Sequence, residues 1–266
     1  MRSLRIAAAV VNSPLGKTRE NLERTEHWAA AARSEGAAIV CFPELNVTGY
    51  GIDERVKAAA EPVSGAVAER LGDMAQRLAV VILAGLAERT ADGRVFASHL
   101  VVSPAGLSGV YRKLHIAPPE EAVFAAGDRA ELFEAAGVRL GIQLCYDAHF
   151  PALSTRMAAE GADVIFMPHA SPRGTPSEKR ASWMRHLPAR AYDNGIFVVA
   201  CNQTGPNGAG STFPGAAVAI GPDGWVLAGY AEEREGLMIA ELKAEALALV
   251  RSHPMRYFLP RRRSDI

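Results

Sequence analysis

Short runs of apolar and often β-branched residues alternate along the chain with longer segments that have helical periodicity. The apolar runs predict strands over residues 4–11, 37–42, 80–87, 96–103, 109–114, 138–144, 163–168, 196–201, 216–220 and 225–228. Many of these runs are apolar at consecutive positions, which is typical of strands buried on both faces or lying inside a sandwich of two sheets.

Helical periodicity predicts four helices, over residues 18–34, 66–78, 152–160 and 177–194. In the second, Val67, Leu71, Met74 and Leu78 recur at helical spacing and predict one buried stripe. Pro188 lies inside the fourth pattern. A proline there either kinks a helix or opens a new one at its first turn.

Glycines mark the joints between these elements. Gly36, Gly161 and Gly195 each end a helix pattern just before a strand, where a left-handed cap is favoured. Pro222-Asp223-Gly224 predicts a tight turn between the last two strands. Because the chain has no internal repeat and no long linker, we predict one α/β domain over residues 1–266, with two packed sheets and helices outside.

The composition excludes several classes of protein. With 49% hydrophobic and 22% charged residues, the chain is typical of a globular protein. Lys plus Arg and Asp plus Glu both number 29, so no net charge attracts nucleic acid or an anionic membrane, and neither is expected as a partner. No run approaches the ~18–20 apolar residues of a membrane span. The three cysteines fit a reducing compartment, and we predict a cytoplasmic protein.

Polar or ionisable residues follow several predicted strands. Glu44, Lys113, Cys145 and Asn202 all occupy such positions. Because strand ends in α/β folds converge on the edge of the sheet where such folds place their sites, we expect these residues to meet in one pocket. Taken singly, Glu44 is more readily interpreted as a surface carboxylate than as a base, and Lys113 as an ordinary solvated charge.

Cys145 differs from Cys41 and Cys201, which we interpret as buried core residues. It stands at a predicted strand-to-helix junction. A helix N-terminus and a nearby ammonium both lower the pKa of a thiol. The sequence therefore predicts a nucleophilic thiol with a lowered pKa at Cys145.

Three local motifs carry a family resemblance. Phe42-Pro43-Glu44-Leu45, with Thr48-Gly49-Tyr50 after it, resembles the glutamate motif of the nitrilase, or carbon–nitrogen hydrolase, superfamily. Tyr111-Arg112-Lys113-Leu114-His115 resembles its lysine motif, and Cys145-Tyr146-Asp147 with Phe150-Pro151 resembles its cysteine motif. The motifs occur in the family's order. The resemblance continues through residues 189–194 and 202–205 and reaches about residue 230.

The resemblance implies a four-layer α-β-β-α sandwich, a homodimer or larger homo-oligomer, and no cofactor. It implies that Cys145 attacks the carbonyl carbon of a small amide or carbamoyl (ureido) compound and forms a thioester, releasing ammonia or an amine. Glu44 is then the general base, and Lys113 stabilises the oxyanion together with a backbone N–H near Tyr146. The family's second glutamate corresponds to Glu120, with Glu121 as the alternative.

Departures from the family pattern bear on the substrate. His149 stands where the family often has an arginine, and Tyr146-Asp147 replaces the tryptophan and glutamate of true nitrilases, which favours amide or carbamoyl substrates over nitriles. We expect the substrate-binding residues to come from one set of candidates: Tyr50, Tyr146, His149, His169, Arg173 and Asn202. His169 is equally well interpreted as a structural histidine, and Arg173 is a candidate for recognising an anionic group.

Other interpretations remain open at this stage. They are a nitrile-hydrolysing variant of the same site and a small-molecule-binding or regulatory protein without turnover. A Cys–His pair with His115, His149 or His169 is a third, although no known cysteine-protease context surrounds Cys145. The histidines show no spacing suited to zinc, so no metal is expected. Residues 253–266 are expected to pack against a partner subunit.

Overall fold

Two mixed six-stranded sheets form the centre of the computed structural model, which describes residues 1–263. The first sheet has the order β14 (Gly236–Leu242), β1 (Leu4–Val10), β2 (Ile39–Cys41), β3 (Val81–Arg89), β4 (Val95–Ser103) and β5 (Gly106–Arg112). The second has the order β13 (Val226–Tyr230), β12 (Ala217–Ile220), β9 (Phe197–Asn202), β8 (Val164–His169), β7 (Val138–Ile142) and β6 (Phe133–Ala135). The short strands β10 (Gly205–Pro206) and β11 (Thr212–Phe213) form a separate pair.

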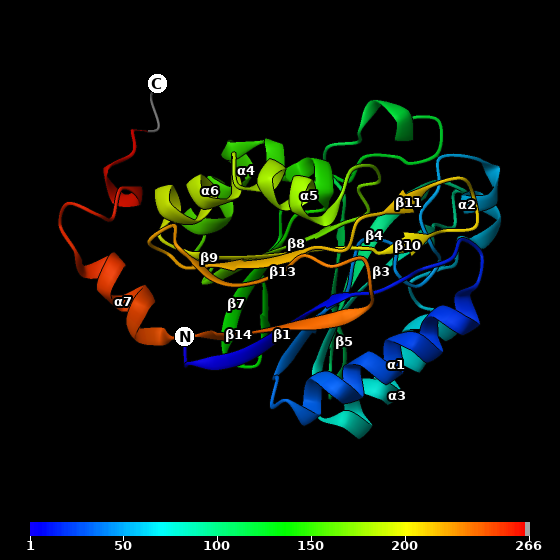
Figure 1. Ribbon diagram of the computed structural model, residues 1–266, viewed down its shortest axis with the longest axis horizontal. Helices are drawn as coiled ribbons and strands as arrows, with labels where there is room; N and C mark the ends of the chain where they lie inside the picture. The colour runs from blue at the N-terminus through cyan, green and yellow to red at the C-terminus, as the bar shows by residue number, and fades with distance from the viewer. Residues whose placement is uncertain (264–266) are drawn as a thin grey trace.

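Helices cover the outer face of each sheet (Figure 1). The first sheet carries α1 (Thr18–Ser34) and α3 (Ala66–Leu78), and the second carries α4 (Pro151–Ala159), α5 (Pro176–Trp183) and α6 (Leu187–Asn194). Two further helices are α2 (Glu54–Ala59) and α7 (Ala244–Ser252). The predicted four-layer α-β-β-α sandwich is confirmed. Among the described residues, no helix combines the length and the apolar character needed to cross a bilayer.

Strand β1 shows why consecutive apolar residues were a useful signal. Ile6, Ala8 and Val10 belong to the core between the two sheets, whereas Ala7 and Ala9 belong to the core under α1 and α3. Side chains alternate across a strand, so a strand that is buried on both faces needs apolar residues at every position.

The helices follow the apolar stripes that the sequence contains. Both α1 and α3 have the predicted bounds, and Val67, Leu71 and Met74 of α3 are buried against the first sheet. Burying each such side chain contributes about 1.5–3 kcal/mol. The fourth predicted helix is two helices, because Pro188 lies in the first turn of α6. Of the two alternatives predicted for Pro188, a kink or the start of a new helix, the second is confirmed.

The glycines at the helix ends and the predicted turn also have the expected conformations. Gly36, Gly161 and Gly195 have φ values of 81°, 99° and 59°, so all three adopt the left-handed conformation predicted for the ends of helices. The predicted turn at 222–224 joins β12 to β13, with Gly224 at a φ of 83°.

Candidate active site

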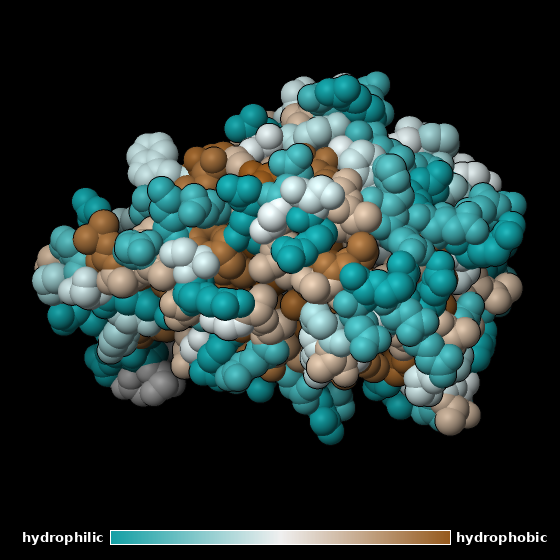
Figure 2. Space-filling view, turned by 90° about the horizontal axis from the view of Figure 1, so that it is seen from below, coloured by the Kyte–Doolittle hydropathy of each residue, from teal (hydrophilic) through white to brown (hydrophobic). Residues whose placement is uncertain are grey.

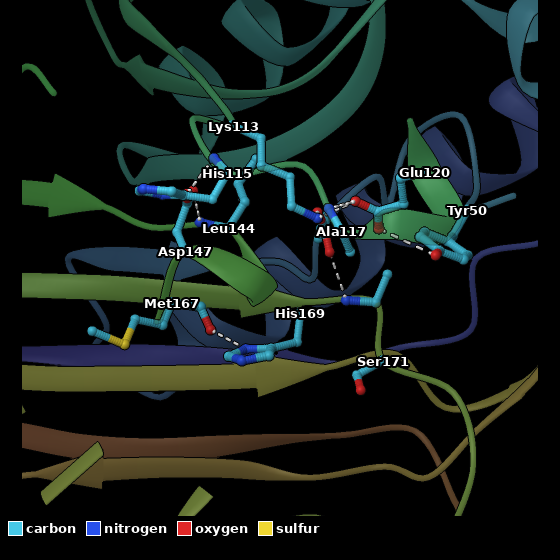
Figure 3. Close-up of polar contacts among 12 residues, drawn as sticks. Tyr50, Lys113, His115, Ala117, Glu120, Leu144, Asp147, Met167, His169 and Ser171 are labelled. Carbon is cyan, nitrogen blue, oxygen red and sulfur yellow. Dashed lines mark hydrogen bonds and ion pairs between the residues drawn. The ribbon is translucent and has the colours of Figure 1, made fainter. Parts of the chain in front are cut away.

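Strand ends from both sheets meet in one buried region. Glu44 follows β2 and Lys113 follows β5 of the first sheet, whereas Cys145 follows β7 and Ala170 follows β8 of the second. Figure 3 shows Lys113, Glu120 and Tyr50 pointing toward one another in this region. The sandwich therefore brings together residues that lie about a hundred positions apart in the sequence.

One buried ammonium lies between two buried carboxylates. Lys113 Nζ donates to Glu44 Oε1 at 2.9 Å and to Glu120 Oε2 at 2.7 Å. The three side chains belong to residues that are 1%, 0% and 4% exposed, respectively. Tyr50 donates its hydroxyl to Glu120 Oε1 at 3.2 Å. Of the two glutamates considered for the second family position, Glu120 is part of this cluster and Glu121 is on the surface.

Glu44 is fixed from several sides. Its Oε2 accepts the backbone N–H of Ala170 at 3.0 Å, and its backbone carbonyl accepts the side-chain amide of Gln203 at 2.8 Å. A buried carboxylate needs such partners because its desolvation is costly. Gln203 and the Ala170 amide were not predicted from the sequence, although Gln203 directly follows the candidate Asn202.

Burial sets the protonation states of this cluster. It raises the pKa of Glu44 to about 7, against the opposing effect of the Lys113 ammonium. Burial lowers the pKa of Lys113, but the negative charges around it, that of Glu44 first, outweigh burial and hold this pKa well above its usual value. Lys113 therefore stays charged at neutral pH, while Glu44 is poised to exchange a proton.

The sequence predicted a lowered pKa for the Cys145 thiol, and this prediction was wrong in direction. Burial raises it, the Glu44 charge raises it further, and Lys113 only partly opposes both. The expected helix N-terminus is a short 3-10 helix, Cys145–His149, which offers a weaker dipole than a longer α-helix. The resting thiol is therefore protonated at neutral pH and needs a base before it can attack.

Two residues of the site adopt the left-handed backbone conformation that non-glycine residues rarely occupy. Cys145 has a φ of 45°, and Leu45, directly after Glu44, has a φ of 55°. Each such residue costs on the order of 1–3 kcal/mol and persists only where its surroundings enforce it. Gly85 is part of these surroundings, since a Cβ there would lie 2.5 Å from the Leu45 nitrogen. Such strain gathers at functional sites.

Asp147 joins the cysteine turn to the lysine segment. Its buried carboxylate accepts the Tyr111 hydroxyl at 2.8 Å, the backbone N–H of His115 at 2.8 Å and the backbone N–H of Leu144 at 3.0 Å. Figure 3 shows this carboxylate between His115 and Leu144. It follows that Asp147 fixes the position of Cys145 relative to Lys113. The sequence placed Asp147 in the cysteine motif but gave no role to it.

The candidate substrate-binding residues fall in different surroundings. Tyr50 is buried in the cluster, and Tyr146 is partly exposed next to Cys145. His149 is exposed, with its ring centroid 4.6 Å from that of His186. Of these residues, only Tyr50 makes a hydrogen bond to the carboxylate cluster within the described part of the chain.

The remaining three candidates lie around the loop that follows β8. The buried His169 bonds the Met167 carbonyl through Nδ1 at 2.7 Å, and burial lowers its pKa to about 3, so it is neutral. Asn202 uses its side-chain amide on the backbone of Ser171 and on the Pro214 carbonyl. Arg173 is exposed, with a φ of 76°.

A cavity of about 650 Å³ adjoins the cluster. Tyr50, Pro119, Arg173 and Asn207 are among its lining residues, and Pro119 directly precedes Glu120. A small organic molecule fits this volume. Within residues 1–263, no group of three or more His, Cys, Asp or Glu side chains is arranged to hold a metal ion.

Comparison with known proteins gives a consistent result. The profile of the carbon–nitrogen hydrolase family matches residues 5–252. An (R)-stereoselective amidase of Pseudomonas sp is 32% identical over 240 residues, which cover 89% of this chain and 84% of that protein. A nitrilase of Pyrococcus abyssi is 30% identical over 243 residues, which cover 90% and 89%, respectively.

Among solved structures, this fold is similar to the amidase from Nesterenkonia sp. AN1. One mutant of that amidase carries the acetamide moiety of fluoroacetamide at its active-site cysteine; the TM-score is 0.79 at 25% identity, with 94% of each chain covered. Another mutant is in complex with butyramide, with a TM-score of 0.79 at 26% identity and 94% of each chain covered.

Proposed function

Because the chain belongs to the carbon–nitrogen hydrolase family of the nitrilase superfamily, we propose that it hydrolyses small amides or carbamoyl compounds through a thioester on Cys145. The observation that carries this proposal is the buried Glu44–Lys113–Glu120 cluster at the strand ends where Cys145 also lies. Such a cluster supplies a base for the thiol and a positive charge for the oxyanion.

In the first half-reaction, Glu44 accepts the thiol proton as the sulfur attacks the carbonyl carbon. The carbonyl π electrons move to oxygen, and the Lys113 ammonium stabilises the resulting charge. Glu44 then returns the proton to the leaving nitrogen, the C–N bond breaks, and ammonia or an amine departs. The product is an acyl thioester on Cys145.

In the second half-reaction, Glu44 takes a proton from water as the water oxygen attacks the thioester. The C–S bond breaks, the sulfur regains a proton, and a carboxylic acid leaves. Glu120 and Tyr50 act through Lys113 in this scheme. Glu120 neutralises the second side of the ammonium, so that Lys113 stays fixed while the charge on Glu44 changes.

The proposal is tested by measuring ammonia release from short aliphatic amides, ω-amides, N-carbamoyl amino acids, N-carbamoyl amines and matching nitriles. We expect release from at least one amide or carbamoyl group, with kcat/KM at least about tenfold higher than for the matching nitrile. The amidase relatives and Tyr146-Asp147 after the cysteine support this order.

Two other results would replace the proposal. Release from nitriles in preference to amides would assign a nitrile-hydrolysing enzyme, as the name of the Pyrococcus relative suggests. If no compound of the panel releases ammonia and iodoacetamide does not modify Cys145 at neutral pH, the protein would be assigned as a binding protein without turnover.

We also propose that the chain forms a homodimer or larger homo-oligomer through the end of the molecule that carries α7. Trp225, Leu249 and Met255 are 75%, 66% and 77% exposed. On the face drawn in Figure 2, the broadest hydrophobic patches lie on the left half, at the end where Figure 1 places α7. Exposed apolar surface of this kind is typical of subunit interfaces.

Deleting residues 253–266 is expected to lower the sedimentation coefficient toward that of a monomer. The deleted segment includes Met255 and residues 264–266, which lie outside the described part of the chain. Met255→Asp is expected to act in the same direction while keeping the contacts that Arg262 makes to Thr155 and Asn194 within the chain. Leu107→Asp, an exposed apolar position on β5, serves as the control. Equal sedimentation of the deletion variant and the wild type contradicts this interface.

A further inference from the structure

One buried histidine has no part in the proposed reaction. His99 of β4 is 0% exposed, and neither of its ring nitrogens has a hydrogen-bond partner among residues 1–263. Burial lowers the pKa of this ring to about 3, and the backbone of Leu83 opposes that effect only in part, so the ring is neutral. An unpaired polar ring stabilises a core less than an apolar side chain of similar volume does. Hydrogen bonding therefore does not explain the place of His99 in the core.

His99 is the middle member of a row of three residues across the first sheet. Its partners on the neighbouring strands are Gly85 of β3 and Tyr111 of β5. Residues directly opposite each other on paired strands share one face of the sheet. Tyr111 belongs to the core between the two sheets, so His99 faces the same core. The row lies close to the end of β5 that Lys113 follows.

At one end of this row, Gly85 holds the loop of the glutamate motif. Its backbone N–H donates to Asn46 Oδ1 at 2.8 Å, and its carbonyl accepts the backbone N–H of Val47 at 2.9 Å. A Cβ on Gly85 would lie 2.5 Å from the Leu45 nitrogen and 2.9 Å from His99 Nδ1. The Leu45 backbone and the His99 ring therefore share the space that Gly85 leaves open, and the ring packs against the strained turn at Leu45.

At the other end of the row, Tyr111 is tied to the cysteine turn. Its hydroxyl donates to Asp147 Oδ2 at 2.8 Å, and the same oxygen accepts the backbone N–H of Leu144 at 3.0 Å. Leu144 directly precedes Cys145. His99 thus lies between the strand residue that holds the glutamate loop and the tyrosine that holds the cysteine turn.

We propose that His99 is a positioning residue, whose ring sets the spacing between the Leu45 turn and Tyr111. This inference rests on the proposed function, because that spacing places Glu44 for proton transfer from Cys145. The ring acts through its volume, so an apolar side chain of similar volume can replace it. Alanine cannot, since a residue in a strained conformation, such as Leu45, keeps it only where its surroundings enforce it.

The test measures kcat, KM and the pH profile of His99→Ala on the best amide substrate. We expect kcat to fall about tenfold to a hundredfold while KM stays within about threefold, because a small displacement of a reacting group costs up to about 10²-fold in rate. The inflection of kcat/KM should also move to higher pH. A displaced Glu44 loses contact with the Lys113 ammonium and the Ala170 N–H, and both oppose the rise in its pKa that burial causes.

Two further variants separate positioning from stability. His99→Leu restores most of the volume without the unpaired nitrogens, so we expect a kcat within about threefold of the wild type and a Tm that is at least as high. Val101→Ala is the matched control, because Val101 is 0% exposed and lies two positions farther along β4 in the same core. It should lower Tm as His99→Ala does and leave kcat and the pH inflection unchanged.

The outcomes separate this inference from the proposed function. If His99→Ala behaves like Val101→Ala, or if His99→Leu loses as much activity as His99→Ala, the role of His99 is rejected and the amide hydrolase stands. If the wild type hydrolyses no amide or carbamoyl compound, the rate at which iodoacetamide alkylates Cys145 replaces kcat. A slower rate in His99→Ala than in the other two variants then supports the role of His99, and equal rates reject it. A wild-type Cys145 that does not react rejects both proposals.

Discussion

Replacing Cys145 with alanine is expected to abolish amide hydrolysis, with kcat lower by roughly 10⁵-fold or more. The variant lacks the sulfur that forms the thioester, and the base and the oxyanion stabiliser have no nucleophile to assist. The measurement is ammonia release from the best substrate of the panel. Circular dichroism and thermal unfolding show whether the variant is folded.

The chain offers matched controls for this variant. Cys41 and Cys201 are both buried, and Cys201 Sγ lies 3.7 Å from the Cys41 carbonyl oxygen. Cys41→Ala and Cys201→Ala remove the same atom as Cys145→Ala, and we expect their kcat to stay within about threefold of the wild type at some cost in stability. Turnover in Cys145→Ala above a few per cent of the wild-type rate would rule out a thioester at this residue.

The sequence predicted the helices and strands whose buried side chains recur at a regular spacing along the chain. Helices α1 and α3 were predicted to the residue, because α1 is closed by Gly36 and α3 carries one apolar stripe. The edge strand β14 was not predicted. Its residues Gly236–Leu242 become a strand through pairing with β1, where Leu242 lies opposite Leu4. A partner more than two hundred residues away leaves no signal in a short window of sequence.

The sequence also predicted that the strand ends meet in one site. It did not predict the side-chain contacts around those strand ends. Glu44 and Lys113 were placed from the rule that sites lie at strand ends, and the structure joins them with a hydrogen bond of 2.9 Å. Gln203 reaches the site from a segment whose orientation depends on tertiary packing. The pKa of Cys145 was misjudged for the same reason, since burial of a thiol cannot be determined from its neighbours in sequence.

Replacing Glu44 with glutamine is expected to lower kcat by about 10²–10⁴-fold, the usual contribution of general acid–base catalysis. The glutamine side chain has the same shape and can still accept the Ala170 N–H through its oxygen. It cannot take the proton of the Cys145 thiol, and burial keeps that thiol protonated. Glu121→Gln removes a carboxylate on the surface and should leave kcat unchanged.

The pH dependence of kcat/KM is expected to identify Glu44 as the base. Its pKa of about 7 means that it is protonated, and inactive as a base, at lower pH. The kcat/KM of the wild type should therefore rise with pH through about 7 and then level off, because Lys113 stays charged well above this range. Glu44→Gln should retain only a low activity without this inflection.

The histidines near the site whose pKa is lowered do not produce the same inflection. The pKa of His169 is lowered to about 3 and that of His186 to about 4, both chiefly by burial, so these rings are already neutral at pH 6. The Cys145 thiol loses its proton only far above neutrality. Stopped-flow or steady-state profiles from pH 5 to 9, compared between the wild type and Glu44→Gln, therefore assign the inflection. An inflection near pH 7 that survives in Glu44→Gln would mean that another group takes the thiol proton.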